Sequence, residues 1–123
     1  MIRQAVEELG RVEGVRLALV VSLDGLLVSS SGRGGDREEV VAAMSAAILG
    51  TVNRVAASAG LGRVSDVLIG ASDASLQVMQ AGDAVIVVVA ERAANVGLVR
   101  LAMKRIAARV GQFLTKETAW SRH

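Results

Sequence analysis

The chain has 123 residues, no cysteine, and its only histidine at the last position, so it is one domain's worth of sequence without disulfides. This composition also argues against histidine acid–base catalysis and against thiolate or histidine zinc sites. The net charge of +2 is uneven, because residues 1–91 hold seven basic and eleven acidic side chains whereas residues 92–123 hold seven basic and one acidic. The basic end predicts either a solvated helix face or a surface for an acidic partner.

Hydrophobic residues make up 52% of the chain, but only two residues are aromatic. The scarcity of aromatic rings argues against a single-stranded nucleic-acid binder, which uses them as stacking platforms. No run reaches the roughly 18 unbroken apolar residues of a membrane span, and no leader-like segment is recognisable. We therefore expect a cytoplasmic protein with no nucleic-acid partner and no membrane insertion, and the excess hydrophobicity predicts a large subunit interface.

The first third of the chain predicts a helix followed by a hairpin. Residues 1–11 form an amphipathic helix, with Ile2, Ala5, Val6 and Leu9 on one face. Residues 15–22 and 26–30 are strand-like, and Asp24-Gly25 between them predicts a tight turn with positive φ at both positions.

A long helix is expected from Asp36 to Gly60. Asp36 and Glu39 have the spacing of a reciprocal N-terminal cap. Gly60 suits the left-handed conformation that ends a helix, with Leu61 supplying an apolar contact. The preceding loop, Ser30 to Gly35, is rich in glycine but lacks the Gly-Lys-Ser/Thr of a phosphate-binding loop, and Asp36 and Glu39 would repel phosphate. A mobile loop is the simpler interpretation.

Three more strands and a helix complete the pattern. Strands are predicted over residues 64–71, 75–81 and 84–90, and short polar joints between them favour antiparallel hairpins. The last strand is apolar on both faces, as in a strand covered on both sides. A helix follows from Asn95 to about Phe113. Its apolar stripe consists of Val99, Ala102, Met103, Ile106, Val110 and Phe113, and its basic half of Arg100, Lys104, Arg105 and Arg109. Residues 1–113 thus predict a single α+β domain, and residues 114–123 a flexible tail.

The long helix carries the functional argument because it is apolar almost all round. Gly50 inside an exposed helix would cost about 1 kcal/mol relative to alanine, whereas a small residue lets another backbone approach closely. We expect one face to cover the domain's own sheet and the other to contact the same helix of a second copy. The sheet-facing residues are predicted to be Val41, Met44, Ile48, Val52, Val55 and Ala59, and the small residues to be Ala42, Ala43, Ala46, Ala47, Gly50 and Ala57.

This pattern resembles the Roadblock (dynein light chain) family, especially its bacterial MglB-type members, which regulate small Ras-like GTPases. The resemblance covers about residues 1–113, and the order, lengths and turns of the elements agree together although no single motif is diagnostic. It rests on the 14–30 hairpin with Leu23-Asp24-Gly25-Leu26, the 36–60 helix, the 64–90 strands and the segment Asn95-Val96-Gly97-Leu98-Val99-Arg100.

The resemblance implies a three-layer α/β/α domain. Its five-stranded antiparallel sheet would have the order 2-1-5-4-3, with helices 1 and 3 on one face and the long helix on the other. It also implies a homodimer that aligns the long helices and pairs the third strands, and a small Ras-like GTPase that docks on the paired helices. Together with the helical wheel, it gives dimer contacts at Ala43, Ala46, Ala47, Gly50, Val67 and Ile69, and partner contacts at Asn53, Arg54 and Ser58.

The expected function is therefore a non-enzymatic, GTPase-activating type of regulator without catalytic residues, cofactor or metal. Arg54 has two alternatives, because it either contacts an acidic surface or snorkels to solvent from the rim of the interface. Arg33 is a weaker candidate for a partner contact. A structural scaffold with no effect on hydrolysis is the alternative function, and an enzyme or small-molecule sensor is disfavoured by the missing histidine, cysteine and aromatic pocket residues.

Overall fold

A computed structural model describes residues 2–33 and 35–121, with side chains as far as Gly111. The chain alternates between helices and antiparallel strands, and each element lies close to where the sequence predicts it. The elements are α1 (Ile2–Gly10), β1 (Val15–Ser22), β2 (Leu27–Gly32), a 3₁₀ turn (Gly35–Arg37), α2 (Glu38–Ala59), β3 (Asp66–Gly70), β4 (Ala74–Ala81), β5 (Ala84–Glu91) and α3 (Val96–Ser121).

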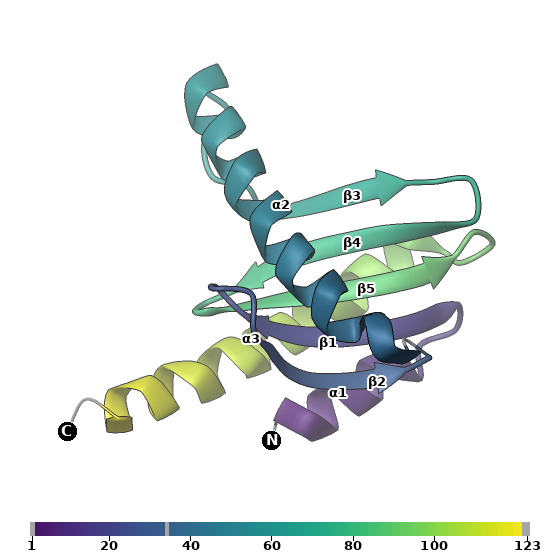
Figure 1. The fold of residues 1–123 in the computed structure, drawn as a ribbon, viewed down its shortest axis with the longest axis horizontal. Helices are drawn as coiled ribbons and strands as arrows, with labels where there is room; N and C mark the ends of the chain where they lie inside the picture. The colour runs from purple at the N-terminus through teal and green to yellow at the C-terminus, as the bar shows by residue number, and fades with distance from the viewer. Residues whose placement is uncertain (1, 34, 122–123) are drawn as a thin grey trace.

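The five strands form one antiparallel sheet in the order β2-β1-β5-β4-β3, which confirms the predicted fold (Figure 1). Strand β5, which the sequence predicts to be apolar on both faces, lies at the centre of this order and pairs with β1 from Val15↔Ala90 to Ser22↔Ala84. Helices α1 and α3 cover one face and α2 crosses the other (Figure 1). The sheet therefore ends in two edge strands, β2 and β3.

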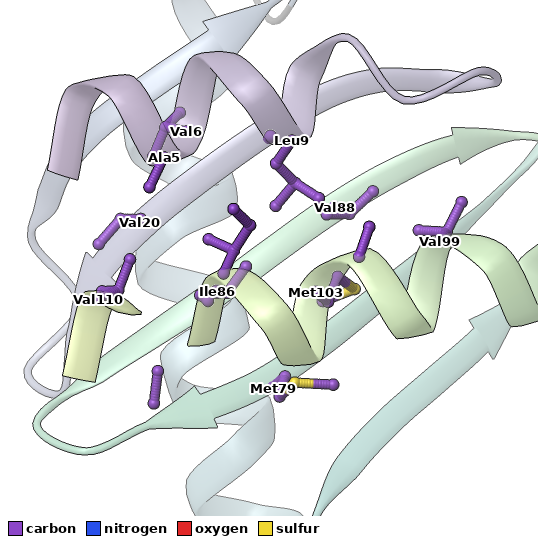
Figure 2. Close-up of a cluster of buried hydrophobic side chains, with 14 of the residues drawn as sticks. Ala5, Val6, Leu9, Val20, Met79, Ile86, Val88, Val99, Met103 and Val110 are labelled. Atoms are coloured by element: carbon purple, nitrogen blue, oxygen red, sulfur yellow. The ribbon is translucent and has the colours of Figure 1, made fainter. Parts of the chain in front are cut away.

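The larger core lies between the sheet and the pair α1–α3 (Figure 2). Alternate residues of β1 and β5 point into it because successive side chains of a strand face opposite sides. The predicted stripe of α3 is buried as far as the structure describes it, whereas Phe113 lies outside the described side chains. The fully buried members include Val6, Leu9, Val20, Ile86, Val88, Val99, Met103 and Val110.

The smaller core lies under α2, and here the predicted helix face was right only in part: Val41 packs against this core, whereas Ala59 is exposed. The buried residues of α2 are Ala42, Ser45, Leu49 and Ala56, whereas Met44 and Val55 were expected on the sheet and point outward. Small side chains on the inner face let the helix lie close to the sheet, and Leu49 fills the remaining space. The larger apolar side chains are thus left on the outer face.

Two predicted local details also differ from the structure. Asp24 does not have a positive φ: the turn spans four residues, only Gly25 is left-handed (φ 92°), and the Gly25 N–H donates to the Ser22 carbonyl. Asp36 lies in the 3₁₀ turn, and no side chain caps α2, whose N-cap is Arg37.

The far end of α2 follows the prediction more closely. Gly60 is left-handed (φ 70°), and the Leu61 N–H donates to the Ala56 carbonyl at 2.8 Å, as in a Schellman cap. Leu61 itself is 72% exposed, so the expected apolar contact is absent. Further on, α3 continues to Ser121 rather than ending near Phe113, so residues 114–121 have helical backbone instead of a loose tail (Figure 1). Residues 122 and 123 lie outside the described residues.

Candidate interaction surface on the long helix

The outer face of α2 carries a regular stripe of residues, here called the outer stripe. Successive members are four and three residues apart, which is the spacing of a helix that packs along another helix. The members are Val40, Met44, Ala47, Thr51, Arg54 and Ser58, and all of them are exposed.

Large apolar side chains on and beside this stripe face solvent. Val40 and Val55 are each 58% exposed and Met44 is 61% exposed. A contiguous apolar surface of this kind marks an interaction site on a folded protein. By length and hydropathy the segment Gly35–Ala59 could also cross a membrane, and 22% of its most apolar window is buried. Since its inner face packs on the sheet, the apolar composition has a structural cause within the domain.

The predicted helix residues divide into two groups. Ala43, Ala47, Arg54 and Ser58 are exposed on the outer face. Gly50 and Asn53 are half-buried at the sides of the helix, and Ala46 is turned towards the sheet, where it packs against the smaller core. The structure thus places the first group where a neighbouring protein can reach it, and Ala46 mainly serves the fold.

Arg54 is the only charged residue between Val40 and Ala59. Its Nη2 donates a hydrogen bond to Thr51 Oγ1 at 3.2 Å, one turn earlier on the same stripe. Thr51, Val55 and Ser58 line a shallow hollow with it. A second, more apolar hollow lies beside Met44 and Ala47. The surface therefore combines two shallow hollows with one positive charge, that of Arg54, which is hydrogen-bonded to Thr51.

The other two predicted interface residues lie on the edge strand β3. Val67 is half-buried and packs against the core under α2, and Ile69, 38% exposed, follows on the same face of the strand. Leu68 points to the opposite face and is 53% exposed. Sequence reasoning did not select Leu68, although an apolar residue in a short edge strand is the signal that identifies it.

Met44 and Val55 were the other residues missed as surface residues. The four-and-three spacing of the outer stripe is readable in the sequence, but the helix is so apolar that several wheel orientations fit equally well. The rotation of α2 about its own axis depends on which small side chains pack against the sheet. The structure shows which of them do so.

Two ion pairs hold α3 against its neighbours on the opposite side of the sheet. Arg100 donates to both carboxylate oxygens of Asp66 at 2.8 and 3.1 Å, which ties α3 to the edge strand β3. These bonds, with the Ser65 hydroxyl, lower the pKa of Asp66, and Asp66 in turn raises the pKa of Arg100. Arg109 donates to Glu8 at 2.6 Å and lowers the pKa of that carboxyl, joining α3 to α1. Two of the four basic residues predicted on α3 thus have internal partners.

Within residues 2–33 and 35–121, no group of three acidic or histidine side chains comes together as a metal site. The surface with the strongest features in the described part of the chain is the exposed apolar outer face of α2. The chain belongs to the Roadblock/LC7 domain family, whose family model matches residues 1–90. A curated relative, the uncharacterized protein MJ1340 of Methanocaldococcus jannaschii, is 34% identical over 110 residues, which are 89% of this chain and 96% of the relative. Since that relative is archaeal, the similarity is not confined to bacterial proteins.

Solved structures support the same fold. MglB of Myxococcus xanthus superposes with a TM-score of 0.86 at 20% identity, over 94% of this chain and 95% of that one. An MglB in a tetrameric arrangement superposes with a TM-score of 0.80 at 23% identity, over 90% of this chain and 85% of that one. At these identities the likeness shows the fold alone.

Proposed function

We propose that the chain is a homodimeric, non-enzymatic cytoplasmic regulator that binds a small Ras-like GTPase and modulates its GTP/GDP cycle, in the manner of a GTPase-activating subunit. No cofactor, nucleic acid or membrane insertion takes part. The observation that carries the proposal is the outer face of α2, on which the apolar side chains of Val40, Met44 and Val55 are each more than half exposed.

The dimer contacts are proposed at Ala43, Ala47, Gly50, Val67 and Ile69, with Ala46 supporting them from beneath. Small residues on the outer face allow two α2 helices to approach closely across a two-fold axis. The same axis brings the two β3 edges together, which removes an exposed strand edge from solvent. Figure 1 shows α2 crossing the sheet from β2 to the edge formed by β3.

The GTPase contacts are proposed at Asn53, Arg54 and Ser58, towards the end of α2. MglB proteins share this fold, and the resemblance to MglB-type regulators supports a GTPase that docks on the paired long helices. Arg54 adds a single positive charge, held by Thr51, to an otherwise uncharged surface, so it favours an acidic patch on the partner. The resemblance to MglB-type activators suggests that regulation would proceed by rearranging the GTPase's own residues, without a catalytic side chain from this chain.

The test combines light scattering with GTP turnover. The chain is expected to run as a dimer and to accelerate GTP hydrolysis by the small Ras-like GTPase whose gene lies nearest in the same genome. Arg54→Glu should weaken this effect about tenfold, equivalent to roughly 1.4 kcal/mol of binding free energy. Arg105→Glu is the matched control, because it makes the same charge change at an exposed position of α3 and should leave turnover unaltered.

Each alternative gives a different result. If the chain binds the GTPase without changing GTP turnover, the scaffold function is correct and the regulatory function is wrong. If the chain is a monomer at tens of micromolar, the proposed dimer is wrong. If Arg54→Glu and Arg105→Glu reduce the stimulation of GTP turnover equally, total charge rather than the α2 surface governs the effect.

A further inference from the structure

A hollow of about 610 Å³ lies beside α3, next to the turn between β4 and β5. This volume is within the range of small-molecule binding sites. Figure 2 shows Met79, one of its lining residues, on the side of α3 that faces away from α1. The lining also includes Arg63 and Ser65 from the loop before β3, Gln80 from β4, Asp83 from the turn and Lys104 from α3. A single chain therefore forms the hollow from segments that are distant in sequence.

The end of β4 has a free backbone edge at this hollow. β4 has eight residues and β3 has five, and their ladder ends at the pair Asp66↔Met79. At the other end of the hairpin the Ala71 N–H donates to the Ala74 carbonyl, and hydrogen-bonded and non-hydrogen-bonded pairs alternate from there. By this alternation Gln80 directs its backbone N–H and C=O towards the side of β4 that β3 does not cover. Within the described sheet, no strand lies opposite this N–H donor.

Two cationic side chains at the hollow have no ion-pair partner among the described residues. They are Arg63 and Lys104, and both are exposed. Arg100 differs, because it is bonded to Asp66 and, with a weaker effect of the Lys104 charge, lowers the pKa of that carboxyl. Asp83 is the second carboxylate nearby. Three cations thus lie near two carboxylates, and the hollow has an excess of positive charge.

We propose that this hollow binds a phosphorylated small molecule the size of a sugar phosphate, with the phosphate group held by Arg63, Lys104 and the Gln80 N–H. Hydrogen bonds from a guanidinium or an ammonium group to phosphate are charge-assisted, and a backbone N–H adds a donor of fixed direction. The proposal goes beyond the proposed function and does not depend on it, because one chain forms the site.

The shape and lining of the hollow indicate what the phosphate is attached to. The hollow is larger than a phosphate ion, and the space beside Met79 accommodates a sugar. None of the described lining residues is aromatic, so the site offers no ring on which a base could stack. These features favour a sugar phosphate over a nucleotide and over free phosphate.

Asp83 gives the proposal a prediction of opposite sign. Its carboxylate lies at the hollow and repels a phosphate, whereas Lys104 attracts one. Lys104→Ala should therefore raise the Kd of a sugar phosphate about tenfold, through the loss of a charge-assisted hydrogen bond. Asp83→Asn should lower the Kd about threefold, as expected for a solvent-exposed charge pair. A neutral ligand would respond to neither substitution in this way.

Titration calorimetry with ribose 5-phosphate tests the site, and is expected to show one saturable site per chain. The backbone amide signal of Gln80 should shift in the NMR spectrum during the same titration. Arg105→Ala is the matched control for Lys104→Ala. It removes the same charge from the next residue of α3, which is exposed and does not line the hollow, and should leave the Kd unchanged.

Four results would overturn the proposal. Without saturable binding of ribose 5-phosphate, the hollow is not a site for this class. If Arg105→Ala raises the Kd as much as Lys104→Ala does, total charge and not the hollow attracts the ligand. Inorganic phosphate that binds as tightly as ribose 5-phosphate would exclude recognition of the sugar. AMP that binds more than about tenfold tighter would show that a base is recognised. The oligomeric state and the GTP turnover are measured separately, so none of these results bears on the proposed function.

Discussion

The two faces of the sheet are covered in different ways. On the α1–α3 face, two helices close over a large core, and the ion pairs Arg100–Asp66 and Arg109–Glu8 fasten α3 at both sides. On the other face, α2 crosses alone, buries four residues and leaves Val40, Met44 and Val55 more than half exposed. The first face contains the larger core, and the second leaves apolar surface exposed to solvent.

A pair of methionines makes this contrast measurable. Met103 on α3 is fully buried and Met44 on α2 is 61% exposed. We expect Met103→Ala to lower the free energy of unfolding by about 2–5 kcal/mol, because it leaves a cavity. Met44→Ala should change it by less than about 0.5 kcal/mol in the monomer but weaken self-association. Urea unfolding followed by circular dichroism over a range of protein concentrations measures both effects.

The contrast would fail if both variants lost similar stability in dilute samples where the chain is monomeric. It would also fail if Met44→Ala left the dimer dissociation constant unchanged, because the exposed methionine would then contribute nothing to the interface.

Most of the fold was predictable because its signals are local and reinforce one another. Strand 84–90 is apolar on both faces, so it had to be central, and Gly60 marked the end of α2 correctly. The predictions of positive φ at both Asp24 and Gly25 and of a helix cap at Asp36 were wrong, because both features depend on backbone angles that contacts with neighbouring elements determine. Gly25, for example, lies where an added Cβ would be 3.2 Å from Ala43 Cα, so the turn is shaped by α2.

The interaction surface was predictable only in part. The sequence identified α2 as apolar all round, and the resemblance to the Roadblock family implied that the third strand is an edge, but neither decided which side of α2 meets the sheet. An amphipathic helix such as α1 has one apolar stripe and therefore one orientation, and its buried residues Ala5, Val6 and Leu9 were predicted correctly. A helix without a polar face lacks that constraint, so Met44 and Ala46 were assigned to the wrong sides.

Gly50 variants test whether the surface of α2 contacts a second copy of the chain. A Cβ added there would meet only Arg54 Nη1, at 3.9 Å, so the single chain has room for a larger residue. Gly50→Ala should therefore raise the free energy of unfolding of the monomer by up to about 1 kcal/mol, through helix propensity. Gly50→Leu should dissociate the dimer if the partner's backbone lies against this position, as light scattering would show. A Gly50→Leu dimer of unchanged affinity would place the contact elsewhere along the outer stripe.

The smallest expected effect concerns the ion pair between Arg100 and Asp66, which ties α3 to the edge strand β3. Arg100→Ala removes both bonds to Asp66, but solvent reaches the guanidinium, so we expect a fall of no more than about 3 °C in Tm at neutral pH. Because Arg100 lowers the pKa of Asp66 below its ordinary value of 3.8, the pair stabilises the fold fully above that value. Its contribution is lost as the pH falls through the lowered pKa and the carboxylate takes up a proton. The Tm difference between wild type and Arg100→Ala should therefore be constant from pH 5 to 7 and shrink below about pH 4. A difference that persists at low pH would mean that the Arg100 side chain acts by packing on β3 rather than through its charge.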